Sequence, residues 1–301
     1  MLYIDLHCHS RYSDGLMAPA DVVRRAAANG ARALALTDHD ETGGLAEARA
    51  AAAALGVAFI TGVEISATWR NHNLHIVGLR FDADNPALQR GLAAIRDGRV
   101  ERAKRMAAEL DRLGIEGSLA GAQTHVSNPR MIGRAHFARF LVERGHAKDV
   151  KAVFKKYLAE GKPGYVAHQW ASLADALGWI SASGGVAVIA HPGRLNADDK
   201  TLCELFAEFK EHGGSAIEVV TGSHTPPQCG QFAEYARRFG LAASVGSDFH
   251  GPLESARDVG ALPELPAGCV PVWQDWAECR AESWTQIGTE AGTPKTSSPA
   301  V

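Results

Sequence analysis

Short strand-like apolar runs alternate along most of the chain with alanine-rich stretches of helical character. The runs that predict strands are Leu2 to Leu6, Ala33 to Leu36, Val57 to Ile60, Val186 to Ala190, Ala216 to Val220 and Ala242 to Val245. The stretches that predict helices are Pro19 to Ala28, Gly44 to Leu55, Leu173 to Ala182, Lys200 to Glu211 and Gln228 to Phe239. A hairpin is expected from Ile65 to Thr68 and Leu74 to Leu79. Repeated strand–helix units indicate an α/β fold with a mostly parallel sheet, either closed as a barrel or doubly wound.

This alternation stops between about residues 85 and 163, where the pattern predicts helices and no buried strand. The expected helices are Leu88 to Leu113, Arg130 to Arg144 and Asp149 to Leu158. We interpret residues 85–163 as a helical insertion over or beside the mouth of a barrel built from residues 1–84 and 164–287. Residues 288–301 lack apolar periodicity, which predicts a disordered tail.

Composition narrows the class of protein. The 301 residues are 46% hydrophobic, and no apolar run approaches the roughly 20 residues that span a bilayer, so we expect no membrane contact. The formal net charge of −3 gives no basic field of the kind that binds nucleic acid non-specifically, and we expect no specific DNA binding. The five cysteines are scattered and form no CxxC pair, which favours reduced thiols in a cytoplasmic protein.

Histidines and acids gather where the predicted strands end. These residues are His7 and His9 after the first strand, His39 after the second, Glu64 after the third, His75 in the hairpin, His191 after a later strand, and Asp248 and His250 after the last. The C-terminal ends of parallel barrel strands face one mouth, so side chains from distant parts of the sequence would meet there. Such convergence is what a metal cluster needs.

The residue types and spacings suit divalent cations. His7 and His9 stand two apart in an extended chain and point to the same side, as do Asp248 and His250. Imidazole and carboxylate ligands suit Zn, Mn or Fe. Glu64 can bridge two ions, because a carboxylate offers one oxygen to each. A single histidine of this kind is more often structural, but so many at successive strand ends are hard to explain by coincidence.

Other acids stand beside these candidates. Asp14, in the loop after the first strand, could reach a position beside His39 and His250. Asp5, Asp38 and Asp40 flank candidate ligands, and two roles stay open for them: they either orient the ligands or serve as capping and solvent-facing residues.

The segments LHCHSRYSDG, LTDHD, GVEIS, AHP and GSDFH resemble the motifs of the PHP (polymerase and histidinol phosphatase) superfamily. The resemblance covers most of the chain outside the insertion. It implies a distorted (β/α)7 barrel of TIM-like form with a trinuclear site, for which Mn is the expected metal and Zn or Fe are alternatives. Carried over by position, it implies one ion on His7, His9, Glu64 and Asp248, a second on Glu64, His75 and His191, and a third on Asp14, His39 and His250.

Such a site implies phosphate ester hydrolysis. Clustered cations meet the charge that builds on phosphate oxygens, and a bridging water becomes acidic enough to attack phosphorus as metal-bound hydroxide. We assign catalytic roles to Asp248, His250 and His224. His224 lies in a loop after another strand, where it could act as a proton donor or contact the phosphate. A histidine that only occupies a surface turn fits the pattern equally well.

The insertion indicates the substrate. Its NPR-x-x-x-R-x-H-x-A-R-F-L-V run is similar to that of the PHP subgroup of nucleoside 3',5'-bisphosphate phosphatases and oligoribonucleotide 5' nucleases. Arg130 and Arg134, four apart on one helix face, would hold a second phosphate away from the metals, while spacing alone favours a solvated face. Tyr12 and Arg194 are further expected contacts. We therefore predict hydrolysis of a nucleoside 3',5'-bisphosphate to a nucleoside monophosphate and phosphate.

Several functions stay open beside this one. A histidinol-phosphate-type phosphatase, or a 5'-3' exonuclease acting on short RNA 5' ends, would use the same kind of metal site. Amidohydrolases also show HxH on a barrel, but they typically add a bridging lysine after a mid-barrel strand, and no lysine precedes residue 101. A non-catalytic PHP module that serves as a scaffold would not need a full ligand set.

Overall fold

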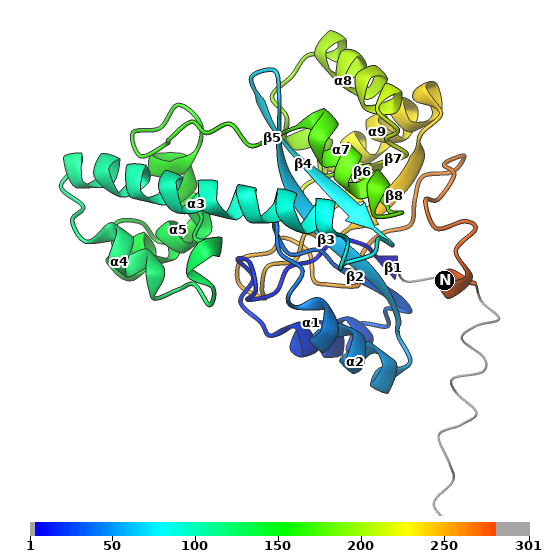
Figure 1. The fold of residues 1–301 in the computed structure, drawn as a ribbon, viewed down its shortest axis with the longest axis horizontal. Coiled ribbons are helices and arrows are strands. Elements are labelled where there is room, and N and C mark those ends of the chain that lie inside the picture. The colour runs from blue at the N-terminus through cyan, green and yellow to red at the C-terminus, as the bar shows by residue number, and fades with distance from the viewer. Residues whose placement is uncertain (1–3, 281–301) are drawn as a thin grey trace, which may run out of the picture.

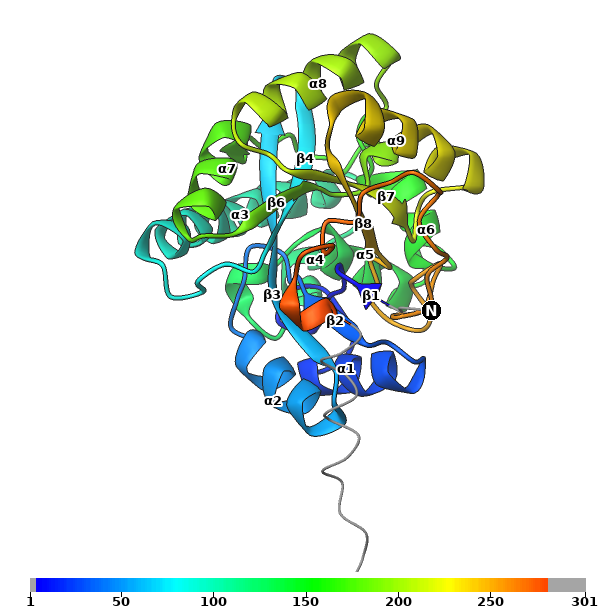
Figure 2. The ribbon, with the colours of Figure 1, turned by 90° about the vertical axis from the view of Figure 1, so that its right-hand side faces the viewer.

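The computed structural model describes residues 4–280. Within them, the strand path β1-β2-β3-β4-β6-β7-β8 forms a nearly closed barrel, and β5 pairs with β3 (Figure 2). The strands are β1 Ile4–Asp5, β2 Ala33–Leu36, β3 Ala58–Trp69, β4 His72–Leu79, β5 Ala171–Ser172, β6 Val186–Ile189, β7 Ala216–Thr221 and β8 Ala242–Gly246. The first and last strands meet where the Leu6 amide donates to the Val245 carbonyl at 3.0 Å. The predicted α/β barrel is confirmed.

One strand runs against the others and shapes the mouth of the barrel. The pairs that β4 forms with β3 and β6 are antiparallel, whereas the other pairs along the path are parallel. The first half of β4 therefore lies at the mouth, where His75 pairs with Ser66. The prediction that separated Val57–Ile60 from Ile65–Thr68 is wrong, because Thr61 continues the pairing with β2 and residues 62–64 pair with β4. Glu64 consequently lies inside β3 rather than after a strand.

Helices cover the outside of the barrel (Figure 1). They are α1 Pro19–Ala28, α2 Leu45–Leu55, α7 Leu173–Ala182, α8 Asp199–Glu211 and α9 Pro226–Phe239, each close to its predicted range. Helix α1 starts with Pro19, and α2 and α9 end at Gly56 and Gly240 in the left-handed conformation, as the usual helix punctuation requires.

The insertion projects to one side of the barrel (Figure 1) and has its own apolar cluster. It contains α3 Pro86–Arg112, α4 Ser118–Gln123, a 3-10 turn Pro129–Met131, α5 Arg134–Glu143, α6 Val150–Val153 and a π-helical turn Phe154–Leu158, without a strand between residues 85 and 163. The first half of α3 packs Leu88 and Leu92 into the barrel core, and its second half packs Met106 and Leu110 into the insertion. The domain boundaries at residues 84/85 and 163/164 stay a prediction.

The helix expected from Arg130 to Arg144 is wrong at its start. After the 3-10 turn the backbone is extended at Ile132 and Gly133, and α5 begins only at Arg134. The Gly133 amide donates to Nδ1 of His136 at 3.1 Å, which caps the new helix. Arg130 and Arg134 therefore do not share a helix face. The predicted tail, residues 288–301, and the last residues of the predicted barrel unit, 281–287, lie outside the described residues. Among the described residues, none of the helices is long and apolar enough to cross a bilayer.

Candidate metal centre

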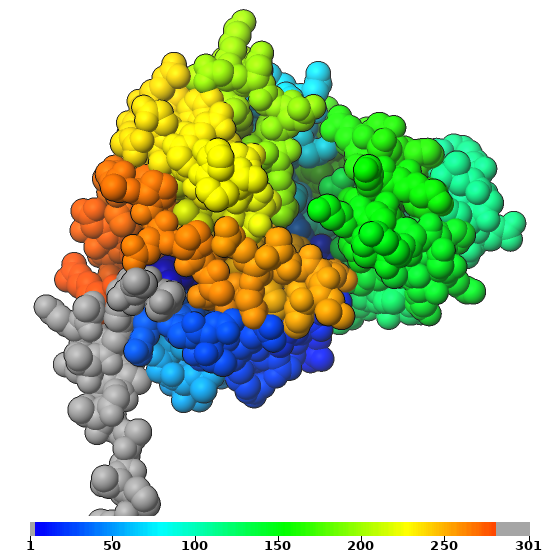
Figure 3. All heavy atoms as spheres, turned by 180° about the vertical axis from the view of Figure 1, so that it is seen from behind, coloured from blue at the N-terminus to red at the C-terminus, as the bar shows by residue number. Residues whose placement is uncertain are grey.

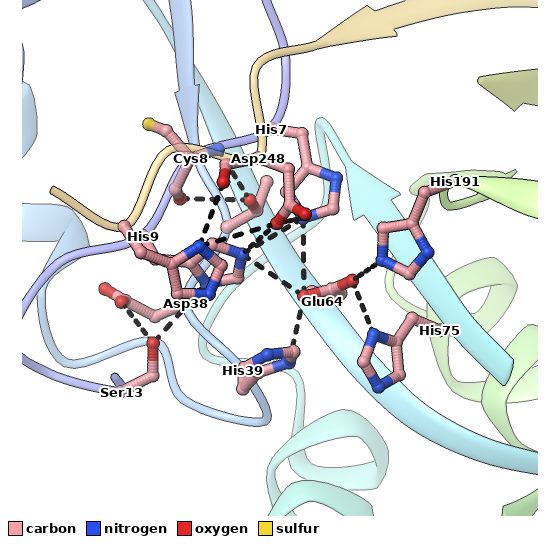
Figure 4. A network of polar contacts seen from close by, with 12 residues as sticks. His7, Cys8, His9, Ser13, Asp38, His39, Glu64, His75, His191 and Asp248 are labelled. Atoms are coloured by element: carbon pink, nitrogen blue, oxygen red, sulfur yellow. Dashed lines mark hydrogen bonds and ion pairs between the residues drawn. The ribbon is translucent and has the colours of Figure 1, made fainter. Parts of the chain in front are cut away.

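One buried carboxylate, that of Glu64, stands at the centre of the site (Figure 4). Its Oε2 lies 3.3 Å from Nε2 of both His7 and His9, and 2.9 Å from Nδ1 of His39. Its Oε1 lies 2.8 Å from Nδ1 of His75 and 3.0 Å from Nε2 of His191. The two oxygens face different sets of imidazoles, which is the arrangement of a carboxylate that bridges cations.

Two further carboxylates complete the cluster. Asp248 Oδ1 lies 3.2 Å from Nε2 of His9, and Asp14 Oδ1 lies 3.3 Å from Nε2 of His250. The side chains predicted as ligands thus converge from β3 and β4 and from the segments that follow β1, β2, β6 and β8. Donor atoms within 4.8 Å of one another form three overlapping groups: His7, His9, Glu64 and Asp248; His9, Asp14, His39 and His250; and His39, Glu64 and His75. The groups share His9 and His39, which the sequence did not predict.

The donor atoms fit a divalent cation better than they fit one another. Ligands held about 2.1 Å from an ion in tetrahedral geometry stand about 3.4 Å apart, close to the separations found here. Nδ1 of His39, Nδ1 of His75 and Oε2 of Glu64 are buried without a hydrogen-bond partner, although the nitrogens lie close to the carboxylate. Buried polar atoms of this kind need a partner, and a cation supplies one.

The pKa shifts of the histidines also favour cation binding. Burial lowers the pKa of His39, and burial together with Arg194 lowers the pKa of His191 to about 4, so both imidazoles are neutral at pH 7 and carry a free lone pair. Burial opposes charge on His9 as well, but Asp248 and Glu64 outweigh it and raise its pKa to about 10. Asp248 and Glu64 therefore stabilise positive charge at His9, and they would stabilise a metal cation at the same place.

Glu218 on β7 is a buried contributor that the predictions from sequence did not include. Its Oε1 accepts a hydrogen bond from Nδ1 of His7 at 2.8 Å, and its Oε2 accepts from the backbone amide of His191 at 2.6 Å. The first contact fixes the tautomer of His7 and leaves the lone pair of Nε2 facing the cluster. The available signal was a single acid inside the otherwise apolar run Ala216 to Val220.

The three flanking acids hold loop backbone rather than imidazole rings. Asp5 accepts from the amides of Ser247 and Gly260, and Asp38 accepts from the amide and hydroxyl of Ser10. Asp40 accepts from the amide of Ser66 at 2.7 Å. Their carboxylates therefore fix the loops on which the ligands stand.

Backbone strain gathers at the same place. Asp40, His191 and Asp248 have φ values of 46°, 28° and 54°. Non-glycine residues in this region cost about 1–3 kcal/mol each, so the surrounding contacts must hold them there. Strain of this kind is typical of ligand sites.

The cluster of candidate ligands opens into a cavity of about 260 Å³ between the barrel and the insertion. Figure 3 shows a hollow between the green insertion and the yellow and orange barrel segments. The barrel side is lined by Asp14, His39, His75, His191, Arg194, Asp248 and His250. The insertion side is lined by Arg99, Arg102, Met131, Arg134 and Phe154, with Trp170 from the segment that returns to the barrel.

The buried Arg102 and the half-buried Arg134 form a cationic pair at the insertion side. Arg102 donates only to the Val166 carbonyl, at 3.1 Å, and no carboxylate of the described residues lies within 4.0 Å of either guanidinium. Burial and the neighbouring Arg134 and Arg99 lower the pKa of Arg102 to about 9, and burial lowers that of Arg134. Like charges brought together without a partner indicate an anion site. Arg99, by contrast, is neutralised by Asp40.

Of the arginines and the tyrosine predicted to contact the substrate, the structure places some at the cavity and others away from it. Arg194 lines the cavity and reaches Oδ2 of Asp248. Arg134 lines it, but Arg130 is exposed and pairs with Asp97, because the break at Gly133 turns it away. Tyr12 lines a different cavity, with Arg11, Glu41 and Asn128 among its neighbours.

His224 is also placed outside the cavity lining. Its buried ring has Nδ1 3.0 Å from the Val219 carbonyl and accepts the Gly193 amide on Nε2 at 3.0 Å. With both nitrogens bound to backbone, His224 supports the turn after His191 and has no free atom for substrate. The described geometry therefore does not support the Arg130 clamp or the His224 proton donor.

A barrel with this mouth and these ligands defines a class of metal-dependent hydrolase, and the chain belongs to the PHP domain family, which it matches over residues 5–221. It is 54% identical to a 3',5'-nucleoside bisphosphate phosphatase of Chromobacterium violaceum over 91% of this chain and 96% of that protein. It is 45% identical to the 5'-3' exoribonuclease Rnm of Escherichia coli, over 91% of this chain and 94% of that protein. A solved structure from Chromobacterium violaceum, described as an amidohydrolase with bound sulfate and no metal, has a TM-score of 0.88 and 54% identity, and covers 90% of this chain and 95% of its own.

Proposed function

We propose that this chain is a metal-dependent phosphatase that removes one phosphate from a nucleoside 3',5'-bisphosphate and leaves a nucleoside monophosphate. The observation that carries the proposal is a single cavity with a cation-binding cluster on one side and the unpaired Arg102 and Arg134 on the other. A 3',5'-bisphosphate has two anions on opposite sides of one ribose, which matches this distribution of charge. The phosphatase relative at 54% identity bears the name of the same activity.

The proposal includes three divalent cations, with Mn as the expected metal. They would be held by the three overlapping groups around Glu64, with His191 completing the group at His75. When bound, the cations supply charge for the phosphate oxygens and acidify water at neutral pH.

The side chains of this chain bind and orient the rest of the substrate. Arg102 and Arg134 would hold the phosphate that is not cleaved, since guanidinium groups bind phosphate oxygens in pairs. Trp170, Phe154 and Met131 offer apolar walls for the nucleoside between the two phosphates. Arg194, beside Asp248, stands where it can bind the phosphate that is cleaved.

Cleavage of short 5'-phosphorylated RNA is a second candidate, favoured by the 45% identity to an exoribonuclease. In such RNA, the 3' oxygen of the first nucleotide carries a phosphodiester, and its 5' oxygen carries a phosphate. Hydrolysis then releases the same nucleoside 5'-monophosphate from the same position. A 3',5'-bisphosphate is therefore the shortest substrate of this series.

A histidinol-phosphate phosphatase, an amidohydrolase and a non-catalytic scaffold fit the cavity less well. Histidinol phosphate has one phosphate and would leave Arg102 and Arg134 without an anion. An amidohydrolase bridging lysine is missing, because no lysine of the described residues lines the cavity. A scaffold would have no use for a converged ligand set.

The compartment is part of the same proposal. All five cysteines are free thiols, which supports a reducing environment. We therefore place the enzyme in the cytoplasm.

The test is steady-state hydrolysis by the purified, Mn-loaded protein. We expect a nucleoside 3',5'-bisphosphate to be cleaved with a much higher kcat/KM than histidinol phosphate, and we expect a chelator to abolish both activities. Asp248→Asn should remove turnover while the protein stays folded by circular dichroism. Faster cleavage of histidinol phosphate would defeat the nucleotide assignment, and full activity after removal of all divalent metal would defeat the metal mechanism.

A further inference from the structure

Near the candidate metal ligands, hydrogen bonds from the insertion end on the loops that carry the outer ligands and, through Arg99, on the hydroxyl of Ser66 in β3 at 2.9 Å. The outer ligands are Asp14, His39 and His250, whose side chains are 19%, 12% and 21% exposed. Each stands on a loop that a buried or nearly buried arginine of α3 or α5 contacts. None of the hydrogen bonds made by residues 85–163 ends on His7, Glu64, His75, His191 or Asp248.

Helix α3 holds the loop of His39 through its neighbour Asp40. Arg96 donates to the Asp40 carbonyl at 2.7 Å, and Arg99 donates to the Asp40 carboxylate at 2.8 Å. Asp40 is fully buried and has a positive φ, so it keeps this conformation only while its contacts persist. The position of His39 therefore depends on two side chains of the insertion.

Helix α5 holds the other two loops through a single side chain. Arg139, 8% exposed, donates from Nε and a terminal nitrogen to the two oxygens of Glu254, both at 2.8 Å, and it also donates to the Asp14 carbonyl. The next residue, Ser255, accepts the His250 amide on its hydroxyl at 2.7 Å. One guanidinium thus ties the loop of Asp14 to the loop of His250.

We propose that Arg139, Arg96 and Arg99 are positioning residues through which the insertion assembles the outer cation position formed by His9, Asp14, His39 and His250. The position at His7 is built on barrel strands and on Glu218, without a hydrogen bond from the insertion, whereas the position at Glu64 and His75 shares His39 and adjoins Ser66, to which Arg99 donates. The inference rests on the proposed metal centre and assigns a second task to the helical insertion, beside that of lining the substrate cavity. It makes one ion of the cluster selectively dependent on how the insertion is docked.

The experiment measures bound metal rather than activity. Arg139→Met removes the fork and keeps much of the apolar stem, and Arg144→Met at the exposed end of the same helix is the matched control. After Mn loading and dialysis, elemental analysis should show about one ion fewer per chain in Arg139→Met than in the wild type. Titration should show an affinity loss of about 10- to 100-fold for that ion alone, the usual effect of removing a group that orients a ligand. Arg144→Met should match the wild type.

A second variant guards against misfolding. Glu254→Gln keeps the size of the partner and should lose the same ion, with anomalous scattering locating the loss beside Asp14 and His250. Unchanged metal content in both variants, or an equal loss at every position, overturns the positioning role. Absence of divalent metal from the wild-type protein would instead defeat the proposed function, so the two failures are distinguishable.

Discussion

At the scale of single residues, the site contains ionisable side chains whose charges or lone pairs are not fully satisfied by other protein groups. Glu64 has more imidazole neighbours than hydrogen bonds can satisfy, and Arg102 and Arg134 have no carboxylate within 4.0 Å among the described residues. Both arrangements are unfavourable for charged groups that are removed from water without a partner. Each is relieved by a ligand of opposite charge: cations at one side of the cavity and a phosphate at the other.

The arginine pair predicts how substrate preference responds to mutation. Arg102→Ala or Arg134→Ala should lower kcat/KM for a nucleoside 3',5'-bisphosphate about 10- to 100-fold, because a hydrogen bond to a charged group contributes about 1.5–3 kcal/mol. Cleavage of a nucleoside 3'-monophosphate should change little. Arg130→Ala is the matched control and should behave like the wild type in steady-state kinetics. An equal loss in Arg130→Ala would restore the clamp that the sequence predicted.

Glu218 predicts a separate effect on the metals. Glu218→Gln keeps the shape of the side chain but weakens its contacts with His7 and the His191 amide, so Mn affinity should fall about 10-fold or more. Isothermal titration of the metal-free protein with Mn measures this directly. Circular dichroism should show an unchanged fold. An affinity equal to that of the wild type would mean that Glu218 only fills space.

At the scale of elements, the tight approach between β8 and the first strand end controls the position of His7. A Cβ on Gly246 would lie 2.2 Å from Cβ of His7 and 2.6 Å from Oε1 of Glu218. Gly246→Ala should therefore destabilise the fold by about 1–3 kcal/mol and weaken metal binding. Urea denaturation of the metal-free protein and Mn titration test the two effects.

The control for Gly246 is a glycine with open space around it. A Cβ on Gly230, within α9, meets nothing within 4 Å. Gly230→Ala should leave metal affinity unchanged and stabilise the protein by up to about 1 kcal/mol, since alanine favours the helix interior. A Gly246→Ala protein as stable as this control would contradict the packing argument.

Elements and ligands were predictable from the sequence to different degrees. Apolar periodicity located the outer helices and most strands, because burial against a sheet is a local pattern. Ligand convergence was predictable, because the direction of parallel strands fixes their ends on one side. The continuity of β3 through Glu64 was not, since it depends on pairing with β4. The break in the helix at Gly133 was not predictable either, since it depends on the contact with His136. This break turns Arg130 away from the cavity.

At the scale of the whole molecule, the net charge of −3 conceals a strong asymmetry. Residues 85–163 contain 16 Lys and Arg against 8 Asp and Glu, whereas the rest of the chain contains 15 against 26. The basic part includes the exposed Lys151 and Lys155, which flank the cavity-lining Val150 and Phe154. An anionic substrate should therefore be drawn toward the insertion side of the cavity.

This asymmetry predicts salt-dependent capture of the substrate. Lys151→Glu combined with Lys155→Glu should lower kcat/KM for a nucleoside 3',5'-bisphosphate about 3- to 10-fold at low ionic strength and leave kcat unchanged, because the lysines act before binding. Above about 0.15 M salt the difference should shrink, since the Debye length falls to about 8 Å. Arg24→Glu combined with Lys200→Glu, on barrel helices α1 and α8, changes the net charge equally and should have a smaller effect. If kcat/KM falls equally in both double variants, net charge alone controls substrate capture, and the insertion does not direct the substrate to the cavity.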